Sequence, residues 1–157
     1  MRNTTLCYLE QNEKYLMLYR NKKKNDLNAG KWVGIGGGFE HRESPEECAK
    51  REIYEETGLI VNELNLRGII TFDNDMSETE YMFLFTSKSF EGSVTSDCNE
   101  GDLAWIDKKD ILSLNLWEGD KYFLKLISED SPFFSMKLSY SKDKLVSVSV
   151  NGKLLNE

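Results

Sequence analysis

Residues 37–59 read GGFEHRESPEECAKREIYEETGL, and this stretch decides the fold of the chain. Ser44, Pro45 and Glu47 form a strong helix start. Serine can cap a helix, proline fits the first helical position, and a glutamate three residues after the serine completes a capping box. Gly58 is placed to end the helix in the left-handed conformation that glycine adopts readily. The sequence therefore predicts one helix between Ser44 and Gly58.

Negative charge is concentrated in the second half of this predicted helix. Glu52 lies three residues before Glu55 and four before Glu56, so helical geometry puts all three carboxylates on one side. Each exposed like-charge pair costs about 0.2–0.5 kcal/mol, and Arg51 can offset only part of this through Glu55. The helix dipole also disfavours negative charge near a C-terminus. A solvated acidic face is one interpretation. A site for a hard divalent cation, which prefers clustered carboxylate oxygens, is the other.

The spacing of these residues resembles the Nudix box, the sequence signature of one family of hydrolases. Gly37, then Glu43 after five residues, then the run REIYEETGL from Arg51 to Leu59 after seven more match the signature completely. The resemblance implies the Nudix fold, which is an α/β (α+β) three-layer α/β/α sandwich with a mixed central sheet. It also implies hydrolysis of a nucleoside diphosphate linked to another group, with Mg²⁺ or Mn²⁺ as cofactor.

The resemblance assigns a role to each charged residue of the box. Glu52, Glu55 and Glu56 would bind the metal, and Glu52 or a neighbouring glutamate would also activate water. Arg51 would orient the carboxylates through charge-assisted hydrogen bonds. Glu43 would support the metal site from across the loop. The cation would polarise phosphoryl oxygens and make hydroxide available at neutral pH.

Segments outside the box resemble the MutT-type hydrolases of oxidised purine nucleoside triphosphates. The matching segments are GKWVGIGG, Ile70–Phe72, EGDLAW and LWEGDKYF. In that group a glutamate five residues before a strand tryptophan completes the metal site. Glu100 stands five residues before Trp105, so we expect Glu100 to be a fourth metal ligand. The alternative is that Glu100 is an ordinary loop residue.

Trp117 and Asp120 match the base-recognition segment of the same group. Trp117 offers a flat apolar face for a purine, and the alternative is that it simply belongs to the core. Asp120 would hydrogen-bond the polar edge of the base, which discriminates strongly when the contact is buried. Lys23, in a basic loop, would meet phosphate oxygens, unless it is simply solvated. The candidate walls of the pocket are Phe72, Leu27 and Met82. The alternative is that they belong to the core, as apolar residues in strands usually do.

Gly37 and Gly38 would let the backbone turn closely beside the metal and the substrate. Three positions depart from the pattern of the resembled group. Gly38 replaces a lysine that often follows the first glycine, and this weakens one expected phosphate contact. Val33 stands where an asparagine reads the base in some members. Gly119 stands where an acidic residue can precede the aspartate. We therefore expect base selectivity that is looser or differently achieved.

Composition narrows the class of protein. The chain has 157 residues with 39% hydrophobic and 30% charged residues, so we expect one globular domain over residues 1–157. Its net charge of -7 argues against a generic grip on nucleic acid or on an anionic membrane. No segment resembles a signal peptide or a membrane span. The three cysteines, Cys7, Cys48 and Cys98, lack the spacing of a metal site and are expected to be reduced thiols, which indicates a cytoplasmic protein. We expect a monomer or a homodimer.

Outside the box, hairpins dominate the pattern and predict a mixed sheet with helices on its faces. We expect an apolar strand interrupted by glycines within residues 31–39, after a basic loop at residues 21–31. The other predicted strands cover residues 3–10, 14–20, 60–74, 79–90 and 102–106, followed by a closing hairpin of MKLSYS and KLVSVSV around SKDK. Further helices are predicted over residues 108–113 and 120–128.

The leading functional hypothesis is a Mg²⁺-dependent pyrophosphohydrolase. It would cleave oxidised purine nucleoside triphosphates such as 8-oxo-dGTP to the monophosphate and pyrophosphate, in a nucleotide-pool sanitising role linked to DNA repair. The alternative within the family is another small nucleotide, such as an ordinary deoxynucleoside triphosphate or ADP-ribose. A different class is a non-catalytic Nudix module that senses a nucleotide. The complete set of box carboxylates and the lack of a DNA-binding segment argue against that class.

Overall fold

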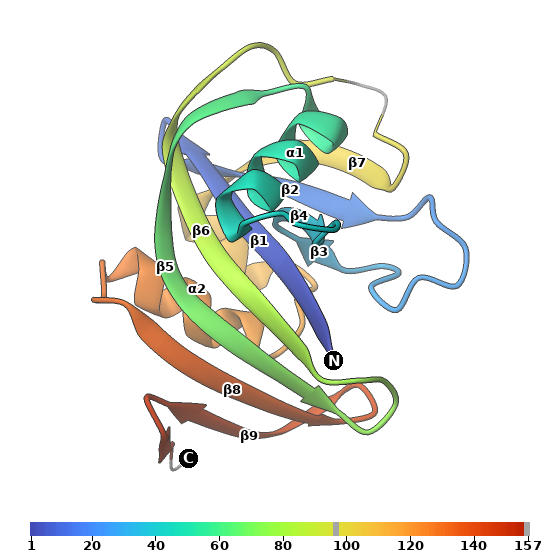
Figure 1. The fold of residues 1–157 in the computed structure, drawn as a ribbon, viewed down its shortest axis with the longest axis vertical. Helices are drawn as coiled ribbons and strands as arrows, with labels where there is room; N and C mark the ends of the chain where they lie inside the picture. The colour runs from blue at the N-terminus through green and yellow to red at the C-terminus, as the bar shows by residue number, and fades with distance from the viewer. Residues whose placement is uncertain (96–97, 156–157) are drawn as a thin grey trace.

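A twisted mixed sheet forms the centre of the protein in this computed structural model, which describes residues 1–95 and 98–155 (Figure 1). Within these ranges the strands are β1 Arg2–Gln11, β2 Lys14–Arg20, β3 Trp32–Val33, β4 Ile35–Gly38, β5 Ile60–Asn74, β6 Glu80–Glu91, β7 Gly101–Asp107, β8 Phe134–Ser141, β9 Lys144–Val150 and β10 Lys153–Leu154. The helices are α1 Pro45–Thr57, the 3₁₀ helix η1 Lys108–Ser113 and α2 Asp120–Ser128.

The sheet contains both parallel and antiparallel pairs. Its main body runs β10-β9-β8-β5-β6-β1, and β4 pairs with β1. The pairs β1·β6 and β5·β8 are parallel, whereas β5·β6, β8·β9 and β1·β4 are antiparallel. Strands β3 and β7 flank β2, which joins β1 through a hairpin where Glu10 pairs with Tyr15. This arrangement confirms the predicted mixed sheet.

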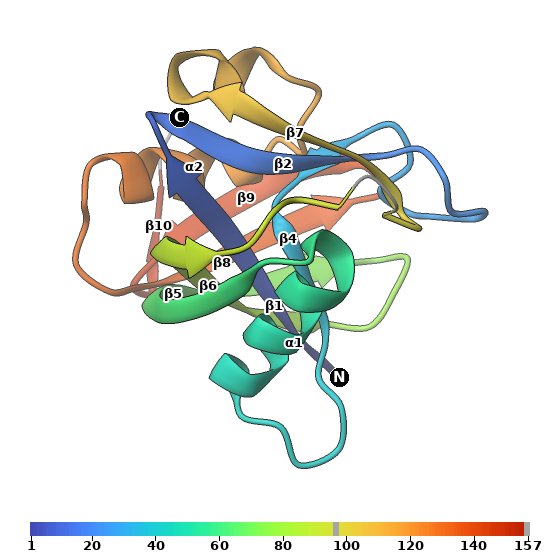
Figure 2. The same cartoon turned by 90° about the horizontal axis from the view of Figure 1, so that it is seen from above.

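The two α-helices cover opposite faces of the sheet (Figures 1 and 2). On one face α2 contributes Phe123, Leu124 and Ile127 to a core with residues of β1, β5, β6 and β8. On the other face α1 contributes Ala49 and Ile53 to a second core. The predicted three-layer α/β/α sandwich is therefore confirmed. Apolar side chains on both faces of one sheet explain why its central strands read as nearly continuous hydrophobic runs.

Helix α1 begins and ends where the sequence predicts. The Ser44 side chain accepts a hydrogen bond from the Glu47 amide at 3.1 Å, and the Glu47 carboxylate accepts one from the Ser44 amide at 2.8 Å. At the other end, Gly58 has a φ of 81° and donates to the Tyr54 carbonyl at 2.9 Å. These caps fix the rotation of the helix, and they thereby fix which glutamates face the sheet.

Two predicted elements differ from the structure. The strand predicted within residues 31–39 is two strands, β3 paired with β2 and β4 paired with β1. They separate at Gly34, where a Cβ atom would lie 3.0 Å from the Cys7 carbonyl and 3.1 Å from the Tyr8 ring. The helix predicted over residues 108–113 is the 3₁₀ helix η1, a short connector that buries Ile111. In addition, β10 forms a short edge strand that the sequence pattern did not predict.

The three cysteines are buried free thiols, as predicted. The Cys48 Sγ atom lies 3.5 Å from the Thr5 hydroxyl and 3.5 Å from the Gly38 carbonyl, so it packs beneath the turn that follows β4. Within the described ranges, no helix is long and apolar enough to span a membrane.

Candidate active site

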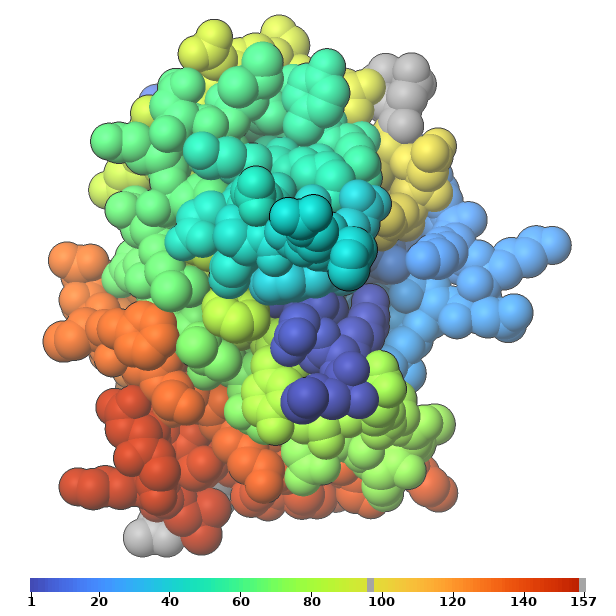
Figure 3. Space-filling view, viewed as in Figure 1, coloured from blue at the N-terminus to red at the C-terminus, as the bar shows by residue number. Residues whose placement is uncertain are grey.

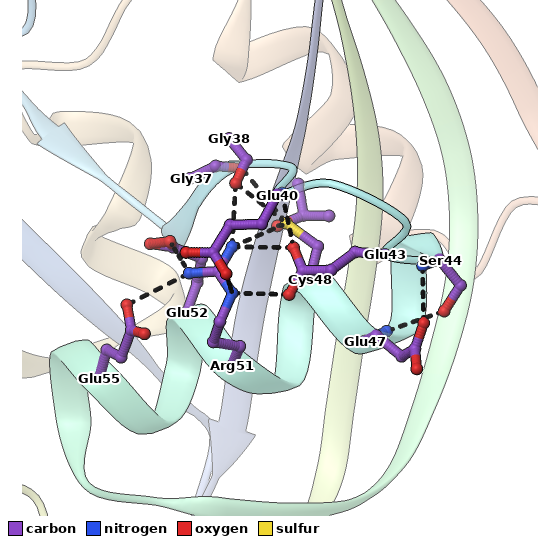
Figure 4. A network of polar contacts seen from close by, with 11 residues as sticks. Gly37, Gly38, Glu40, Glu43, Ser44, Glu47, Cys48, Arg51, Glu52 and Glu55 are labelled. Atoms are coloured by element: carbon purple, nitrogen blue, oxygen red, sulfur yellow. Dashed lines mark hydrogen bonds and ion pairs between the residues drawn. The ribbon is translucent and has the colours of Figure 1, made fainter.

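Arg51 is the centre of the polar network that joins α1 to the turn after β4 (Figure 4). Its Nε and Nη2 atoms donate to the two carboxylate oxygens of Glu43 at 2.6 and 2.9 Å. Its Nη1 atom donates to Glu52 at 2.8 Å and to Glu55 at 3.2 Å. Nη2 also reaches the Gly38 carbonyl at 3.0 Å. One guanidinium therefore orients three carboxylates and the backbone of the turn.

The same contacts set the charge of the turn. Hydrogen bonds from Arg51, aided by the Glu40 amide, lower the pKa of Glu43 to about 2. Hydrogen bonds to Glu43 and Glu52 raise the pKa of Arg51 further above its usual value, so the guanidinium stays charged. Glu43 is thus an ionised anchor that holds the turn against α1.

Glu56 is the most unusual member of the acidic group. Only 5% of its surface is exposed, and no hydrogen-bond partner reaches either carboxylate oxygen among the described residues. Burial is the main cause that raises its pKa to about 9, and the charges of Glu100 and Glu52 add to the rise. A buried carboxyl without a partner costs free energy, so its retention points to a ligand that completes it.

Glu52 lies against β4 and lines a cleft. Its side chain is 14% exposed, and burial raises its pKa even though Arg51 opposes that shift. A Cβ atom on Gly37 would overlap the Glu52 carboxylate. The carboxylate therefore occupies the space that any other residue at position 37 would take. This close approach is the structural reason for the first glycine of the box.

Glu100 reaches the acidic group from the residue before β7. It forms an ion pair with the Nη1 atom of Arg20, at the end of β2. The Nε atom of Arg20 binds Asp26 in the β2–β3 loop at 2.8 Å. The role of Arg20 was missed by sequence reasoning, because it depends on β2 and β7 lying side by side. Arg20 thus links the acidic group to the loop.

The donor set suits a hard divalent cation. Among the described residues Glu56 has no hydrogen-bond partner, and the charges of Glu52 and Glu100 help to raise its pKa, so the three carboxyls are near enough to interact. Across the described residues, no three acidic, histidine or cysteine side chains already stand at metal-ligand spacing. Glu55 lies apart, because its side chain is 55% exposed and is held by Arg51. Carboxylate oxygens grouped in this way fit Mg²⁺ or Mn²⁺.

The acidic group opens on a cleft of about 510 Å³. Ten of the predicted site residues line it, namely Lys23, Leu27, Gly37, Gly38, Glu52, Phe72, Met82, Glu100, Trp117 and Asp120. The others, Glu43, Arg51, Glu55 and Glu56, lie on α1 or in the turn before it. One cavity therefore joins the acidic residues to an aromatic wall, and what these residues bind stays a prediction.

Trp117 forms the aromatic wall and is also part of the core. It is 5% exposed and packs edge to face with Phe72 at 6.1 Å and with Tyr140 at 5.4 Å between ring centroids. Its indole N–H donates to Asn28 at 2.7 Å, and the Lys31 ammonium lies 5.1 Å from the ring centroid. No sequence pattern points to Asn28 or Lys31, because they meet Trp117 only when the β2–β3 loop folds back.

Asp120, at the start of α2, is buried beside this wall. Burial raises its pKa to about 7, and the charge of Lys31 opposes the rise. Just before it, the Gly119 amide donates to the Tyr140 hydroxyl at 2.6 Å. A Cβ atom on Gly119 would lie 2.8 Å from that oxygen. The fold therefore leaves no room for an acidic side chain at position 119.

A model of the NUDIX domain matches residues 1–127. The chain belongs to the Nudix family. It is accordingly a Nudix hydrolase, and enzymes of this family use divalent metals and act on small-molecule nucleotides. The box on α1, its capped ends and the carboxylates around Arg51 are the structural counterpart of this match.

Several relatives of known name resemble the whole chain. An uncharacterised Nudix hydrolase of Bacillus subtilis is 31% identical over 147 residues, covering 91% of this chain and 89% of that protein. An oxidized purine nucleoside triphosphate hydrolase of Mus musculus is 30% identical, and the match covers 93% of this chain and 92% of that protein. One of Danio rerio is 34% identical, and the match covers 84% of this chain and 82% of that protein. The crystal structure of a mutator MutT protein from Bacillus halodurans has a TM-score of 0.87 at 28% identity, covering 98% and 99%.

Proposed function

We propose that this Nudix hydrolase is a Mg²⁺-dependent pyrophosphohydrolase of oxidised purine nucleoside triphosphates such as 8-oxo-dGTP. One observation carries the proposal, namely that a single cleft of about 510 Å³ joins a carboxylate group to an aromatic wall with a buried carboxyl beside it. The first would serve the triphosphate and the second a flat base. The names of the relatives from Mus musculus and Danio rerio support this substrate class.

Glu52, Glu56 and Glu100 would hold the cation, and Glu55 would join them from the exposed side of α1. The support is the orphaned carboxylate of Glu56 and its electrostatic contact with the other two. When bound, the cation polarises phosphoryl oxygens and lowers the pKa of water. Mn²⁺ offers the same oxygen coordination and is expected to substitute.

Within the cleft, the residues of the chain orient the reactants and move the proton. A carboxylate oxygen of Glu52 would take the proton of the attacking water, and Arg51 keeps that carboxylate in place. The water oxygen bonds to a phosphorus of the triphosphate, the anhydride P–O bond breaks, and pyrophosphate leaves. Lys23, which lines the cleft, would balance the charge of the phosphates. Its loop, between β2 and β3, projects at the right of Figure 3.

The base would lie against Trp117, which Phe72, Tyr140 and Lys31 hold in place. Asp120 would bond the edge of the base. Because burial brings its pKa to about 7, it can offer a donor as well as acceptors near neutral pH. The free thiols suit a reducing cytoplasm, and the net charge of -7 suits work on free nucleotides. The enzyme would act there in nucleotide-pool sanitation, as a monomer or homodimer.

A substrate panel with Mg²⁺ tests this proposal. We expect pyrophosphate release from 8-oxo-dGTP to exceed that from dGTP and dATP. ADP-ribose, whose hydrolysis yields AMP and ribose 5-phosphate and is therefore measured as AMP release, should be the poorest substrate. Glu52→Gln should lower turnover by at least a hundredfold, because an amide cannot take the proton of the water. Its melting temperature should stay within a few degrees of wild type, because the variant keeps the shape of the side chain. Hydrolysis of ADP-ribose alone would overturn the substrate class. Turnover of Glu52→Gln at the wild-type rate would overturn the role of Glu52.

A further inference from the structure

A carboxylate outside the box lines the same cleft beside the aromatic wall. Glu80 is the first residue of β6, where it pairs across the sheet with Arg2 of β1 and with Phe72 of β5. Partners directly opposite in a sheet project their side chains on the same face. Because Phe72 packs edge to face against Trp117, Glu80 stands one strand away from the aromatic pair.

The Glu80 carboxylate is held in place but retains free acceptor capacity. The hydroxyl of Thr4, which is 3% exposed, donates to one of its oxygens at 2.6 Å. The Arg2 guanidinium lies 3.6 Å from the other oxygen. An ionised carboxylate has about four acceptor positions, so these contacts leave room for donors from a ligand. With a side chain only 22% exposed, on a central strand, Glu80 is a rigid acceptor.

Glu80 shares the cleft with the carboxyl of Asp120, whereas the carboxyl of Asp26, in the β2–β3 loop, is bound by Arg20. Val33, which also lines the cleft, has no hydrogen-bonding group on its side chain. A carboxylate that cannot donate favours a base edge with N–H groups side by side. Guanine-type bases have such an edge in their ring N–H and amino groups. Adenine sets an acceptor nitrogen beside its amino group, and thymine sets carbonyls on both sides of its single ring N–H.

We propose that Glu80 is a specificity-determining residue, which selects guanine-type bases by accepting hydrogen bonds from their ring N–H and amino groups. This inference rests on the proposed function, because it requires that a nucleotide base enters the aromatic part of the cleft. It explains how the chain reads a base although it has valine at position 33. A partly buried acceptor disfavours a base that cannot donate to it, because its remaining acceptor positions are then left without a partner.

Steady-state kinetics of Glu80→Gln provide the first test. The amide keeps the shape but replaces one acceptor with a donor. We expect KM for dGTP and 8-oxo-dGTP to rise on the order of 10- to 100-fold with kcat within about threefold, and KM for dATP to stay level or fall. Glu78→Gln is the matched control, because Glu78 is 58% exposed, pairs with the N-terminal amine at 3.1 Å and does not line the cleft. It should change neither ratio.

Binding of the monophosphates in EDTA provides the second test, because it needs neither metal nor turnover. Wild type should bind dGMP more tightly than dAMP by calorimetry, and Glu80→Gln should remove most of that preference. Should Glu80→Gln fold poorly, Glu80→Asp, which keeps the charge but withdraws it by one methylene, should weaken dGMP binding in the same direction. Equal loss of dGMP and dAMP binding would assign Glu80 a purely structural role and overturn the inference. Preference for dGMP without any triphosphate hydrolysis would overturn the proposed function and leave the reading of the base intact.

Discussion

At the scale of single residues, burial separates glutamates that look alike in the sequence. Glu56 is 5% exposed and has no hydrogen-bond partner within residues 1–95 and 98–155, whereas the neighbouring Glu55 side chain is 55% exposed and bound to Arg51. Burial raises the pKa of Glu56 to about 9, whereas its usual value is 4.5. The metal-free folded state therefore keeps a proton that the unfolded state loses between these values. It follows that the free energy of unfolding falls as pH rises from about 4.5 to about 9.

Glu56→Gln should remove this loss. In EDTA we expect variant and wild type to have similar stability at pH 5. At pH 9 the variant should be more stable by on the order of 2 kcal/mol or more, because it carries no charge into the interior. Mg²⁺ at pH 9 should raise the melting temperature of wild type and change that of the variant much less. Urea unfolding at both pH values and thermal melts with and without Mg²⁺ measure this.

A control variant separates the buried site from the general charge of the helix. Glu46→Gln, at an exposed position in the first turn of α1, removes the same charge and should show neither effect. A Glu56→Gln variant that tracks wild type at pH 9 would mean that the Glu56 carboxyl is not unpaired in the metal-free protein.

Sequence reasoning identified the type of chemistry at this scale better than its surroundings. The helical spacing put Glu52, Glu55 and Glu56 on one side of α1, and the Arg51–Glu55 contact at 3.2 Å follows from that spacing. Spacing cannot tell which glutamate is buried, because that depends on what packs against the helix. For the same reason Arg20 and Asn28, whose partners are distant in the chain, were not found.

At the scale of elements, β4 and α1 approach one another closely at Gly37, whose backbone packs against the Glu52 carboxylate. A Cβ atom at position 37 would overlap the Glu52 carboxylate, whereas one at position 38 would meet only the Arg2 guanidinium at 4.0 Å. The two adjacent glycines of the box therefore differ in how strictly the structure requires them. The difference comes from the pleat of β4, which turns successive positions to opposite faces.

Gly37→Ala and Gly38→Ala form a matched pair that tests this fit. Gly37→Ala should lower turnover on the order of 10- to 100-fold, because the methyl group displaces the carboxylate that we assign to the metal and to water. Gly38→Ala should cost at most a few fold. Initial rates with Mg²⁺ and the best triphosphate measure both, and circular dichroism verifies that each variant folds. Equal losses in the two variants would show that contact with Glu52 is not what requires glycine at position 37.

Elements whose determining residues lie within the element itself were predicted more accurately than elements that depend on distant neighbours. Helix α1 could be predicted because its caps lie within the stretch itself. The apolar segment at residues 31–39 was predicted as one strand, although β3 and β4 pair with different neighbours. The segment contains Gly34, where the two strands separate, but its close approach to Cys7 and Tyr8 of β1 cannot be inferred from the segment alone.

At the scale of the whole molecule, the last strands complete the sheet. The family match ends at residue 127, within α2, yet β8 lies inside the sheet between β5 and β9. The inward side chains of β8 are fully part of the core that also holds Trp117, namely Phe134, Met136, Leu138 and Tyr140. Tyr140 in addition receives the Gly119 amide and packs against the aromatic wall. The segment after the family match therefore helps to build the cleft.

Truncation after Ser128 should abolish folding. Each large core side chain contributes about 2–5 kcal/mol to stability. The loss of the four inward residues of β8 is therefore comparable to the whole free energy of unfolding of a domain, which is roughly 5–15 kcal/mol. Truncation after Asn151 removes residues 152–157, which include the exposed two-residue strand β10, and should shift the melting temperature by a few degrees. Near-ultraviolet circular dichroism and thermal melts distinguish the two. A folded, active protein ending at Ser128 would show that β8 is dispensable.

Arg20 holds Asp26 of the β2–β3 loop with one nitrogen and Glu100 with another. That loop carries Lys23 and Leu27 to the cleft, while Glu100 belongs to the acidic group. If Glu100 binds the cation as we propose, its ion pair with Arg20 would weaken while that of Asp26 remains, and cation binding would be thermodynamically coupled to the position of the loop. Coupling of this kind is reciprocal: the factor by which a cation changes nucleotide affinity is the factor by which the nucleotide changes cation affinity. Through Arg20, a ligand in either half of the cleft would then change the affinity of the other half.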